Sequence, residues 1–333
     1  MSRLSTGCIR LCEGAAMDIV ILLSCLVAAA RILPAQDLDP ATAWATIAAY
    51  TFRIFPLPDR SLFATPGVVY YRASGVDLKV GVITPGSEKV VRPTVIFIHG
   101  GGWVYYTKDY QIFLTLPYLA RGMDVVNVDY RQSNQARAPA AVEDCRCALH
   151  WVVAHAKEYG LDTSKLVVAG ESAGGHLALM TGMLDQKDGF DDGCAFTVGQ
   201  KYVQEPVHVS AIVNFYGITD VAELLTPPNL KSFAVEWLAD VPNRMDVARR
   251  VSPLTYIRTG LPPIITIHGT DDGAVPYEQA VRLHQGLDQA HVPNKLVTIP
   301  HGQHGVYPDE EKLRAQSEVF KFLEEHGVLT ASH

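Results

Sequence analysis

Residues 166–179 read LVVAGESAGGHLAL: an apolar, β-branched run passes through GESAG into an apolar helical pattern. This is Gly-x-Ser-x-Gly between an expected strand and an expected helix. A turn this tight gives the serine strained dihedral angles, and its flanking glycines are needed because a Cβ atom would collide with a neighbouring strand or helix. The pattern predicts that Ser172 projects above the carboxyl edge of a sheet, with a helix N-terminus behind it. The alternative interpretation is a glycine-rich turn with a capping serine.

Around this motif, runs that favour strands alternate with amphipathic stretches that favour helices. Strands are expected at 68–72, 76–83, 94–99, 124–130, 166–170, 210–216, 263–268 and 295–299, and helices at 111–120, 140–159, 174–184, 277–289 and 309–326. The alternation implies βαβ units and a mostly parallel sheet covered on both faces, an α/β fold. The first two strands are close enough in sequence to form an antiparallel hairpin at one edge. Residues 217–251 break the rhythm with three prolines and short helix-like pieces (220–225 and 231–239), and predict a small lid.

A second glycine-rich stretch, VIFIHGGGW at 95–103, ends an expected buried strand. Three consecutive glycines are entropically unfavourable, and a strand that stops there leaves peptide N–H groups unpaired. Such groups suit an anion that forms during catalysis. The alternative is a turn whose N–H groups bind only water or backbone.

A serine hydroxyl needs a base that is itself oriented by a carboxylate. Candidates follow the last two expected strands, at the same sheet edge as the serine: Asp271 and Asp272, then His301 and His304. That edge is where parallel α/β sheets form their sites. One aspartate could simply cap a turn, and one histidine could be a solvated loop residue. His304 is favoured as the base because two glycines give its loop the freedom to bring an imidazole to the serine.

Together, HGGGW, GESAGGHLAL, HGTDDGAVP and the late His-Gly pair resemble serine esterases of the α/β-hydrolase fold. The chain is most similar to the hormone-sensitive-lipase-like group and to bacterial feruloyl- and acetyl-xylan-esterase-like (BD-FAE-type) enzymes. A Y-R…P-A-A-x-x-D stretch within 125–145 adds to the resemblance, which runs from about residue 68 to the C-terminus. One departure is Gln-Ser-Asn after Arg131, where lipase-like relatives carry Leu-Ala-Pro. Another is His301, where many xylan-type relatives have glycine.

The resemblance assigns roles. It implies that Ser172 is the nucleophile, His304 the general base, and Asp272, the fifth residue of the H-G-x-x-D-x-x-V-P pattern, the acid. It implies that the oxyanion hole is formed by the backbone of Gly101, Gly102 and Ala173. Substrate pockets come from several loops, and the aromatic residues that could line them, or could equally be core or lid packing, are Tyr105, Tyr106, Tyr216 and Trp237.

The expected activity is hydrolysis of short-chain carboxylic esters through an acyl-enzyme, with no metal or cofactor required and with acetylated or feruloylated carbohydrate as a possible substrate. The alternatives are an amidase, formamidase or exopeptidase on the same fold, and a catalytically inactive binding protein.

Composition sets further limits. The 333 residues carry 28 Lys+Arg and 35 Asp+Glu, a net charge of −7, without a basic block, which argues against nucleic-acid and anionic-membrane binding. Among Cys145, Cys147 and Cys194 at most one disulfide can form, and their spacing does not suggest a metal site.

The N-terminal segment, 1–36, resembles a secretory signal peptide, with basic residues before an apolar run at 19–30. That run is shorter than the ~20 residues of a spanning helix. The alternatives are a packed N-terminal helix or a true start at Met17. The expected organisation is therefore an exported protein whose catalytic domain covers 37–333, with cytoplasmic location if the segment is retained.

Overall fold

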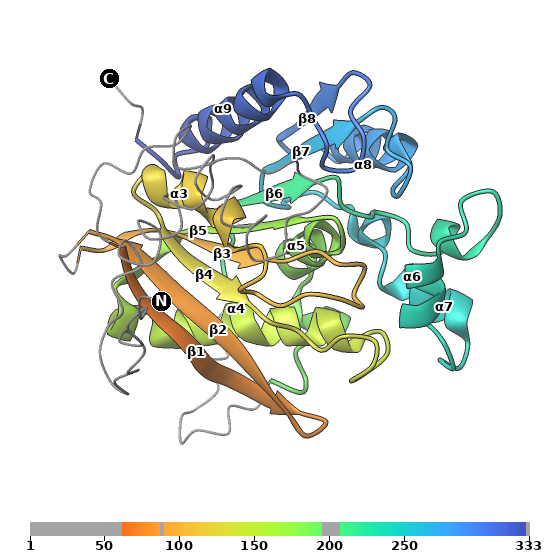
Figure 1. The fold of residues 1–333 in the computed structure, drawn as a ribbon, viewed down its shortest axis with the longest axis horizontal. Coiled ribbons are helices and arrows are strands. Elements are labelled where there is room, and N and C mark those ends of the chain that lie inside the picture. Colours follow the sequence, from red (N-terminus) through yellow and green to blue (C-terminus); the bar gives the residue numbers. More distant parts are fainter. Residues whose placement is uncertain (1–61, 87–89, 195–206, 331–333) are drawn as a thin grey trace, which may run out of the picture.

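The computed structural model describes residues 62–86, 90–194 and 207–330, so the expected signal segment at 1–36 lies outside the described residues. The described part is built on one sheet of eight strands in the order β1-β2-β4-β3-β5-β6-β7-β8 (Figure 1). The strands are β1 (Leu62–Ala73), β2 (Val76–Pro85), β3 (Arg92–Ile98), β4 (Asp124–Val128), β5 (Leu161–Glu171), β6 (Ala211–Phe215), β7 (Ile264–Gly269) and β8 (Asn294–Ile299).

Strand pairing confirms a mostly parallel sheet with a hairpin at one edge. β1 pairs antiparallel with β2, and β2 antiparallel with β4, whereas every pair from β4 to β8 is parallel. In the centre, Ile96 of β3 lies in register with Val126 on one side and Val168 on the other. Because parallel strands end at the same edge, the loops that follow β3, β5, β7 and β8 meet there.

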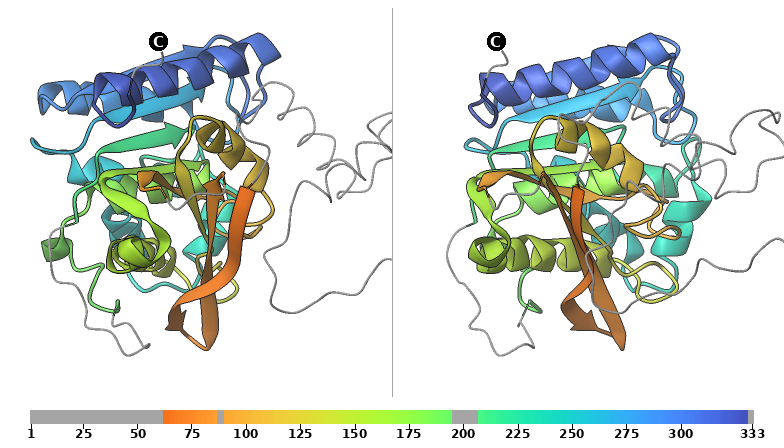
Figure 2. Two further views of the ribbon diagram at one scale, coloured as in Figure 1. Left: turned by 90° about the vertical axis from the view of Figure 1, so that its left-hand side faces the viewer. Right: turned by 60° about the vertical axis from the view of Figure 1, so that its left-hand side comes forward.

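Helices cover both faces of the sheet (Figures 1 and 2). The α-helices are α3 (Leu116–Ala120), α4 (Ala140–Tyr159), α5 (Ala173–Met183), α6 (Ser232–Trp237), α7 (Arg244–Arg250), α8 (Tyr277–Gln289) and α9 (Asp309–Glu325); the 3₁₀ helices are η1 (Ile112–Thr115), η2 (Gln186–Asp188), η3 (Glu223–Leu225) and η4 (Pro253–Tyr256). Ile96 and Ile98 point into the core that α4, α5 and α8 cover, while Val95 and Phe97 point into the core beneath α3 and α9. Burial on both faces explains why β3 is apolar at every position from Val95 to Ile98.

Two helical predictions differ from the structure. The stretch 111–120, expected as one helix, is divided into η1 and α3. Pro117 sits in the first turn of α3, where its missing N–H costs nothing, but its ring would clash with a carbonyl of the preceding turn if one α-helix ran through. In the lid, the expected pieces shorten to η3 and α6, and α7 was not expected.

The insertion expected as a lid, 217–251, packs onto the main core. Trp237 and Leu238 are fully buried, as is Ala234, and all three belong to the same apolar cluster as residues of α4 and α5. Burial of this extent is typical of a fixed element, because exposing such side chains would cost several kcal/mol.

A disulfide joins Cys147 of α4 to Cys194, with Cα atoms 5.0 Å apart, and Cys145 is a buried free thiol. Of the three cysteines considered above, one pair is therefore bonded. Within the described residues no helix is long and apolar enough to cross a membrane.

Candidate active site

Ser172 stands at the turn from β5 to α5 with φ 55° and ψ −122°, dihedral angles that are unfavourable for a residue with a Cβ atom. Two glycines permit the turn: a Cβ on Gly170 would lie 2.3 Å from the Gly174 carbonyl oxygen, and one on Gly174 would lie 2.1 Å from that of Ile98. The Ser172 amide donates to the Phe215 carbonyl at 2.8 Å. The serine is thus held at the carboxyl edge of the sheet, as the Gly-x-Ser-x-Gly pattern predicts.

Three side chains predicted from separate stretches come together at this edge. His304, in the loop between β8 and α9, places Nε2 2.8 Å from the Ser172 hydroxyl oxygen. Its Nδ1 lies 2.8 Å from Oδ2 of Asp272, in the loop after β7. A carboxylate only accepts hydrogen bonds, so Nδ1 carries the proton and Nε2 is free to accept one from the serine. This is the nucleophile–base–acid geometry that activates a hydroxyl.

The Asp272 carboxylate is held ionised by its surroundings. Burial opposes its ionisation, but hydrogen bonds from His268 and His304 and the His304 charge bring the pKa of Asp272 well below its usual range. Its Oδ1 accepts the backbone N–H groups of Ala274 and Val275 at 2.8 and 2.9 Å. The carboxylate therefore has a fixed orientation, which in turn fixes the His304 ring.

The neighbouring candidates form a separate pair on the surface. His301 Nδ1 lies 3.1 Å from Asp271 Oδ2, and the His301 side chain is 89% exposed. Backbone bonds from Thr270 to Ile299 and from Asp271 to Gly302 also connect the two loops. These contacts fasten the Asp272 loop to the His304 loop, and neither side chain of the surface pair contacts Ser172.

The first of the expected oxyanion donors, the Gly101 N–H, is oriented by hydrogen bonds to the carbonyl of the same peptide group, which belongs to Gly100. The Gly100 carbonyl accepts the Tyr130 hydroxyl at 2.9 Å and the Nδ1–H of His99 at 2.8 Å. In a planar trans peptide the N–H points away from the C=O, so these bonds turn the N–H of Gly101 in the opposite direction. Burial lowers the pKa of His99 to about 4, which keeps its ring neutral.

The second expected oxyanion donor, the Gly102 N–H, is oriented in the same way. The Gly101 carbonyl accepts the N–H groups of Val104 and Tyr105, both at 3.0 Å, which leaves the Gly102 N–H on the other side of its peptide. Among the described residues no protein acceptor binds the N–H of either glycine. Ala173 is the first residue of α5, so its N–H has no acceptor within the helix.

The backbone conformation and the surrounding atoms require glycine at both Gly101 and Gly102. They have φ of 100° and 62°, in the left-handed region. A Cβ on Gly101 would lie 2.3 Å from the Tyr105 carbonyl oxygen, and one on Gly102 would lie 2.9 Å from the Phe233 Cβ of α6. Side chains are excluded by the protein itself.

Trp103 and His176 are buried and pack against each other. Trp103 Nε1 donates to His176 Nδ1 at 3.2 Å, and His176 Nε2 donates to the Val251 carbonyl at 2.6 Å. Burial lowers the pKa of His176 to about 4, consistent with this neutral tautomer. The residue that follows the two glycines is thereby attached to the end of the lid.

The four candidate substrate contacts lie in three different settings. Tyr105 and Tyr106 are 62% and 41% exposed on the loop after the glycines. Tyr216 packs edge-on against His304 with ring centroids 4.8 Å apart. Trp237 is completely buried and stacks on Trp103, so its side chain has no surface to offer a substrate.

Sequence reasoning missed several residues around the site. Glu171, Tyr130 and Phe233 contact the loop at 100–102 that carries the expected oxyanion donors. His268 Nε2 lies 3.3 Å from Oδ2 of Asp272 and 3.1 Å from the Val275 carbonyl oxygen. For two of these residues the sequence held a usable signal, which is proximity to a motif: Glu171 directly precedes the serine, and His268 begins the motif that contains Asp272. Which loop each side chain faces depends on contacts between distant segments.

Comparisons with known proteins agree with this fold. The chain is 30% identical to Esterase LipC of Mycobacterium tuberculosis over 56% of this chain and 46% of that protein. It is also 30% identical to the probable carboxylic ester hydrolase LipM of the same organism, over 64% and 49%. The chain thus spans about half the length of these curated relatives.

A solved esterase structure aligns with a larger part of the chain than these relatives do. Propionate-bound esterase 2 of Thermogutta terrifontis is 28% identical, with a TM-score of 0.65 over 81% of this chain and 97% of that one. The family model BD-FAE matches residues 80–287, which is more than half of the chain. This protein therefore has an α/β-hydrolase fold and belongs to the BD-FAE family.

Proposed function

We propose that this protein hydrolyses carboxylic esters through a serine acyl-enzyme. The observation that carries the proposal is the pair of 2.8 Å contacts that runs from the Ser172 hydroxyl through His304 to the Asp272 carboxylate. The naming of its relatives as esterases and ester hydrolases supports the same reaction class.

In the proposed reaction, His304 Nε2 takes the hydroxyl proton as Ser172 Oγ attacks the ester carbonyl carbon. The carbonyl electron pair moves onto oxygen, where the N–H groups of Gly101, Gly102 and Ala173 stabilise the charge. Asp272 stabilises the imidazolium that forms. The tetrahedral intermediate then expels the alcohol, which leaves with the proton from His304. Water, deprotonated by the same imidazole, then attacks the acyl carbonyl carbon. As the second tetrahedral intermediate breaks its bond to Ser172 Oγ, His304 returns the proton to that oxygen and the carboxylic acid leaves.

The decisive test is Ser172→Ala. We expect turnover of p-nitrophenyl butyrate to fall by about 10⁴-fold or more, because no other group can form the acyl-enzyme. Mass spectrometry should find one organophosphate adduct per chain, absent from this variant. Ser164→Ala, at an exposed serine away from the site, serves as the control. Retained turnover in Ser172→Ala would refute the mechanism.

We further propose a preference for short acyl groups. The Phe233 side chain packs directly over Gly102, which limits the space beside the oxyanion donors. The relative from Thermogutta terrifontis has been solved with propionate and with butyrate. We expect kcat/KM to be highest for acetate to butyrate esters, and Phe233→Ala to shift the optimum to longer chains. Faster turnover of decanoate esters by the unaltered protein would contradict this preference.

The same measurements separate esters from amides. An ester has the better leaving group, so we expect p-nitrophenyl butyrate to be turned over far faster than butyric p-nitroanilide. Comparable rates on the two, normalised to their spontaneous hydrolysis, would identify the alternative amidase, formamidase or exopeptidase activity.

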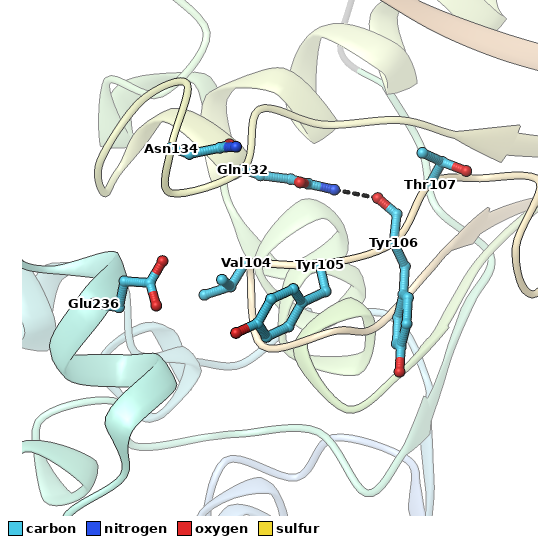
Figure 3. A pocket seen from close by; sticks show the side chains of 7 residues that line it. All are labelled: Val104, Tyr105, Tyr106, Thr107, Gln132, Asn134 and Glu236. Carbon is cyan, nitrogen blue, oxygen red and sulfur yellow. Dashed lines mark hydrogen bonds between the residues drawn. The ribbon is translucent and has the colours of Figure 1, made fainter.

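A pocket beside the oxyanion loop favours a carbohydrate ester as the substrate (Figure 3). Its lining is formed by Val104, Tyr105, Tyr106, Thr107, Gln132, Asn134 and Glu236. It adjoins the site, because the Tyr106 ring lies 2.8 Å from where a Gly101 Cβ would stand. The two side-chain amides of the lining, Gln132 and Asn134, lie where lipase-like relatives carry Leu-Ala-Pro.

This lining suits an alcohol rich in hydroxyl groups. A sugar ring can stack its C–H face on the exposed Tyr105 ring. Its hydroxyls can donate to the Glu236 carboxylate and to amide oxygens. We expect acetate or ferulate release from acetylated or feruloylated oligosaccharides. The double variant Tyr105→Ala, Asn134→Ala should raise KM for these substrates about tenfold more than KM for p-nitrophenyl acetate; an equal change for both would argue against a sugar site.

Export remains part of the proposal. The Cys147–Cys194 disulfide supports it, because such bonds persist in oxidising compartments. Mass spectrometry of the mature N-terminus in the native host tests it: a mature chain that lacks the N-terminal apolar segment is expected, and an intact segment in a cytoplasmic protein would contradict export.

A further inference from the structure

Glu171, the residue before the nucleophile, has a buried carboxylate that the proposed relay does not use. It is 6% exposed and ends β5, and its side chain turns toward the loop that carries the oxyanion glycines. The Gly100 amide donates to Glu171 Oε1 at 2.9 Å. A Cβ on Gly100 would lie 2.1 Å from that oxygen, so only glycine admits the carboxylate here.

Two further side chains hydrogen-bond to this carboxylate. They are the Gln111 amide, from the segment before η1, and the Tyr216 phenol, which follows β6. With the backbone N–H of Gly100, three donors from three segments converge on one anion. Burial raises the pKa of Glu171 above its usual value, and the three donors oppose this rise, so they stabilise the anion and fix its orientation.

Tyr216 extends the connection to the base. Its ring packs edge-on against the His304 ring, and a Cβ on Gly305 would lie 2.7 Å from its hydroxyl oxygen. Its own φ of 40° shows that the backbone is held in an unfavourable conformation to place the ring there. The loop that carries His304 thus rests on a tyrosine whose hydroxyl is tied to Glu171.

We infer that Glu171 is a positioning residue that joins the oxyanion loop, through Gly100, to the base loop, through Tyr216. The inference rests on the proposed serine mechanism. It adds that the Glu171 carboxylate aligns both the proposed oxyanion donors and the base, His304. Tyr216, considered above as a substrate contact, acts in this scheme as the link and not as part of a pocket.

The charge of Glu171 also acts on His304. The titratable groups that face the carboxylate are four tyrosines, whose pKa values burial raises, and His304; the tyrosines are Tyr106, Tyr130, Tyr216 and Tyr307. On the other side of its ring His304 faces Asp272. The four tyrosines stay neutral over the pH range in which the enzyme would work. Of these five groups, His304 is therefore the one whose positive charge the Glu171 carboxylate stabilises during turnover.

The test compares Glu171→Gln, which removes the charge but keeps the shape, and Tyr216→Phe, which removes only the link. Active-site titration with a p-nitrophenyl organophosphate gives kcat per reactive serine. We expect kcat per site to fall about tenfold in each, with KM changed less than about twofold, since alignment matters most in the transition state. Affinity for a phenylboronic acid, whose serine adduct is tetrahedral, should fall in parallel.

A pH profile adds a readout that a purely structural role would not move. Loss of the negative charge in Glu171→Gln should shift the acid limb of kcat/KM to lower pH, because the imidazolium is less stabilised. Tyr216→Phe keeps the carboxylate and should leave the limb nearly in place.

Asp124→Asn is the matched control, since Asp124 is also a buried carboxylate but begins β4 at the opposite sheet edge. It should leave kcat per site unchanged. The inference is overturned if both test variants keep kcat per site and boronic acid affinity within twofold of the unaltered protein. If Glu171→Gln does not fold, Tyr216→Phe alone decides. Failure of the serine mechanism itself is recognised separately, by activity in Ser172→Ala.

Discussion

The indole of Trp103 lies flat on the indole of Trp237, with ring centroids 4.2 Å apart and planes inclined by 14°. Trp103 directly follows Gly101 and Gly102, the proposed oxyanion donors, and Trp237 ends α6 in the 217–251 insertion. Both are fully buried, and the neighbouring Phe233 covers Gly102. The glycine loop at 100–103 is therefore packed against the 217–251 insertion, so the two cannot move apart without exposing a large apolar surface.

This stacking predicts that Trp237→Ala weakens both stability and catalysis. The cavity should lower the free energy of unfolding by about 3–5 kcal/mol. Loss of the support under Trp103 should also lower kcat per titrated serine. Trp151→Ala, which makes a similar cavity in α4, should destabilise comparably and leave kcat per site unchanged. Denaturant unfolding and active-site titration measure both quantities, and equal kcat values in the two variants would contradict the coupling.

Tyr130→Phe should lower kcat with little effect on KM. Its hydroxyl donates to the Gly100 carbonyl at 2.9 Å and so orients the Gly101 N–H, the first of the proposed oxyanion donors. Loss of a whole donor costs about 3–4 kcal/mol, so a misaligned one should cost roughly 1 kcal/mol, or several-fold in kcat. The control is Tyr118→Phe, because the Tyr118 hydroxyl is buried without a partner among the described residues. Steady-state kinetics that give the same kcat for both variants would count against this orientation.

Asp272→Asn should reduce kcat by about 10⁴-fold while the protein stays folded. An amide at this position can donate to His304 Nδ1, which would stabilise the tautomer that cannot accept the serine proton. Asp271→Asn, which alters only the exposed pair with His301, should stay within about twofold of the unaltered protein. Kinetics on p-nitrophenyl butyrate test the pair of variants; a small effect at residue 272 would show that the carboxylate is dispensable.

Acid should destabilise the protein partly through Asp191. Burial opposes its ionisation, but hydrogen bonds from Arg146 and His150 and their charges lower its pKa to about 2. A carboxylate with a depressed folded-state pKa contributes stability that is complete above its ordinary value near 4 and is lost as pH falls toward 2. The contribution is about 2 kcal/mol. Denaturant unfolding between pH 5 and 2 should show a shallower loss in Asp191→Asn; parallel curves would exclude this role.

Much of the fold could be predicted from local sequence patterns. The helices at 140–159 and 277–289 match α4 and α8 residue for residue, because their apolar spacing fits one helical face throughout. The stretch 111–120 was wrong as a single helix, since apolar spacing does not register the effect of a proline on the turn before it. The short α7 escaped notice because its exposed, charged sequence has little periodicity.

Within the site, the sequence alone determined which chemistry could occur. It supplied a strained serine turn, a glycine loop, and acid and base candidates past the last strands, because each of these depends on a few adjacent residues. The family pattern selected Asp272 over its neighbour, and the open loop favoured His304. Only the tertiary structure decided that Glu171 faces Gly100, that Tyr216 supports the base, and that Trp237 is buried behind the oxyanion loop. These contacts join segments up to some 130 positions apart in the sequence. Which distant segments come into contact depends on how the whole sheet assembles, and no local sequence pattern encodes that.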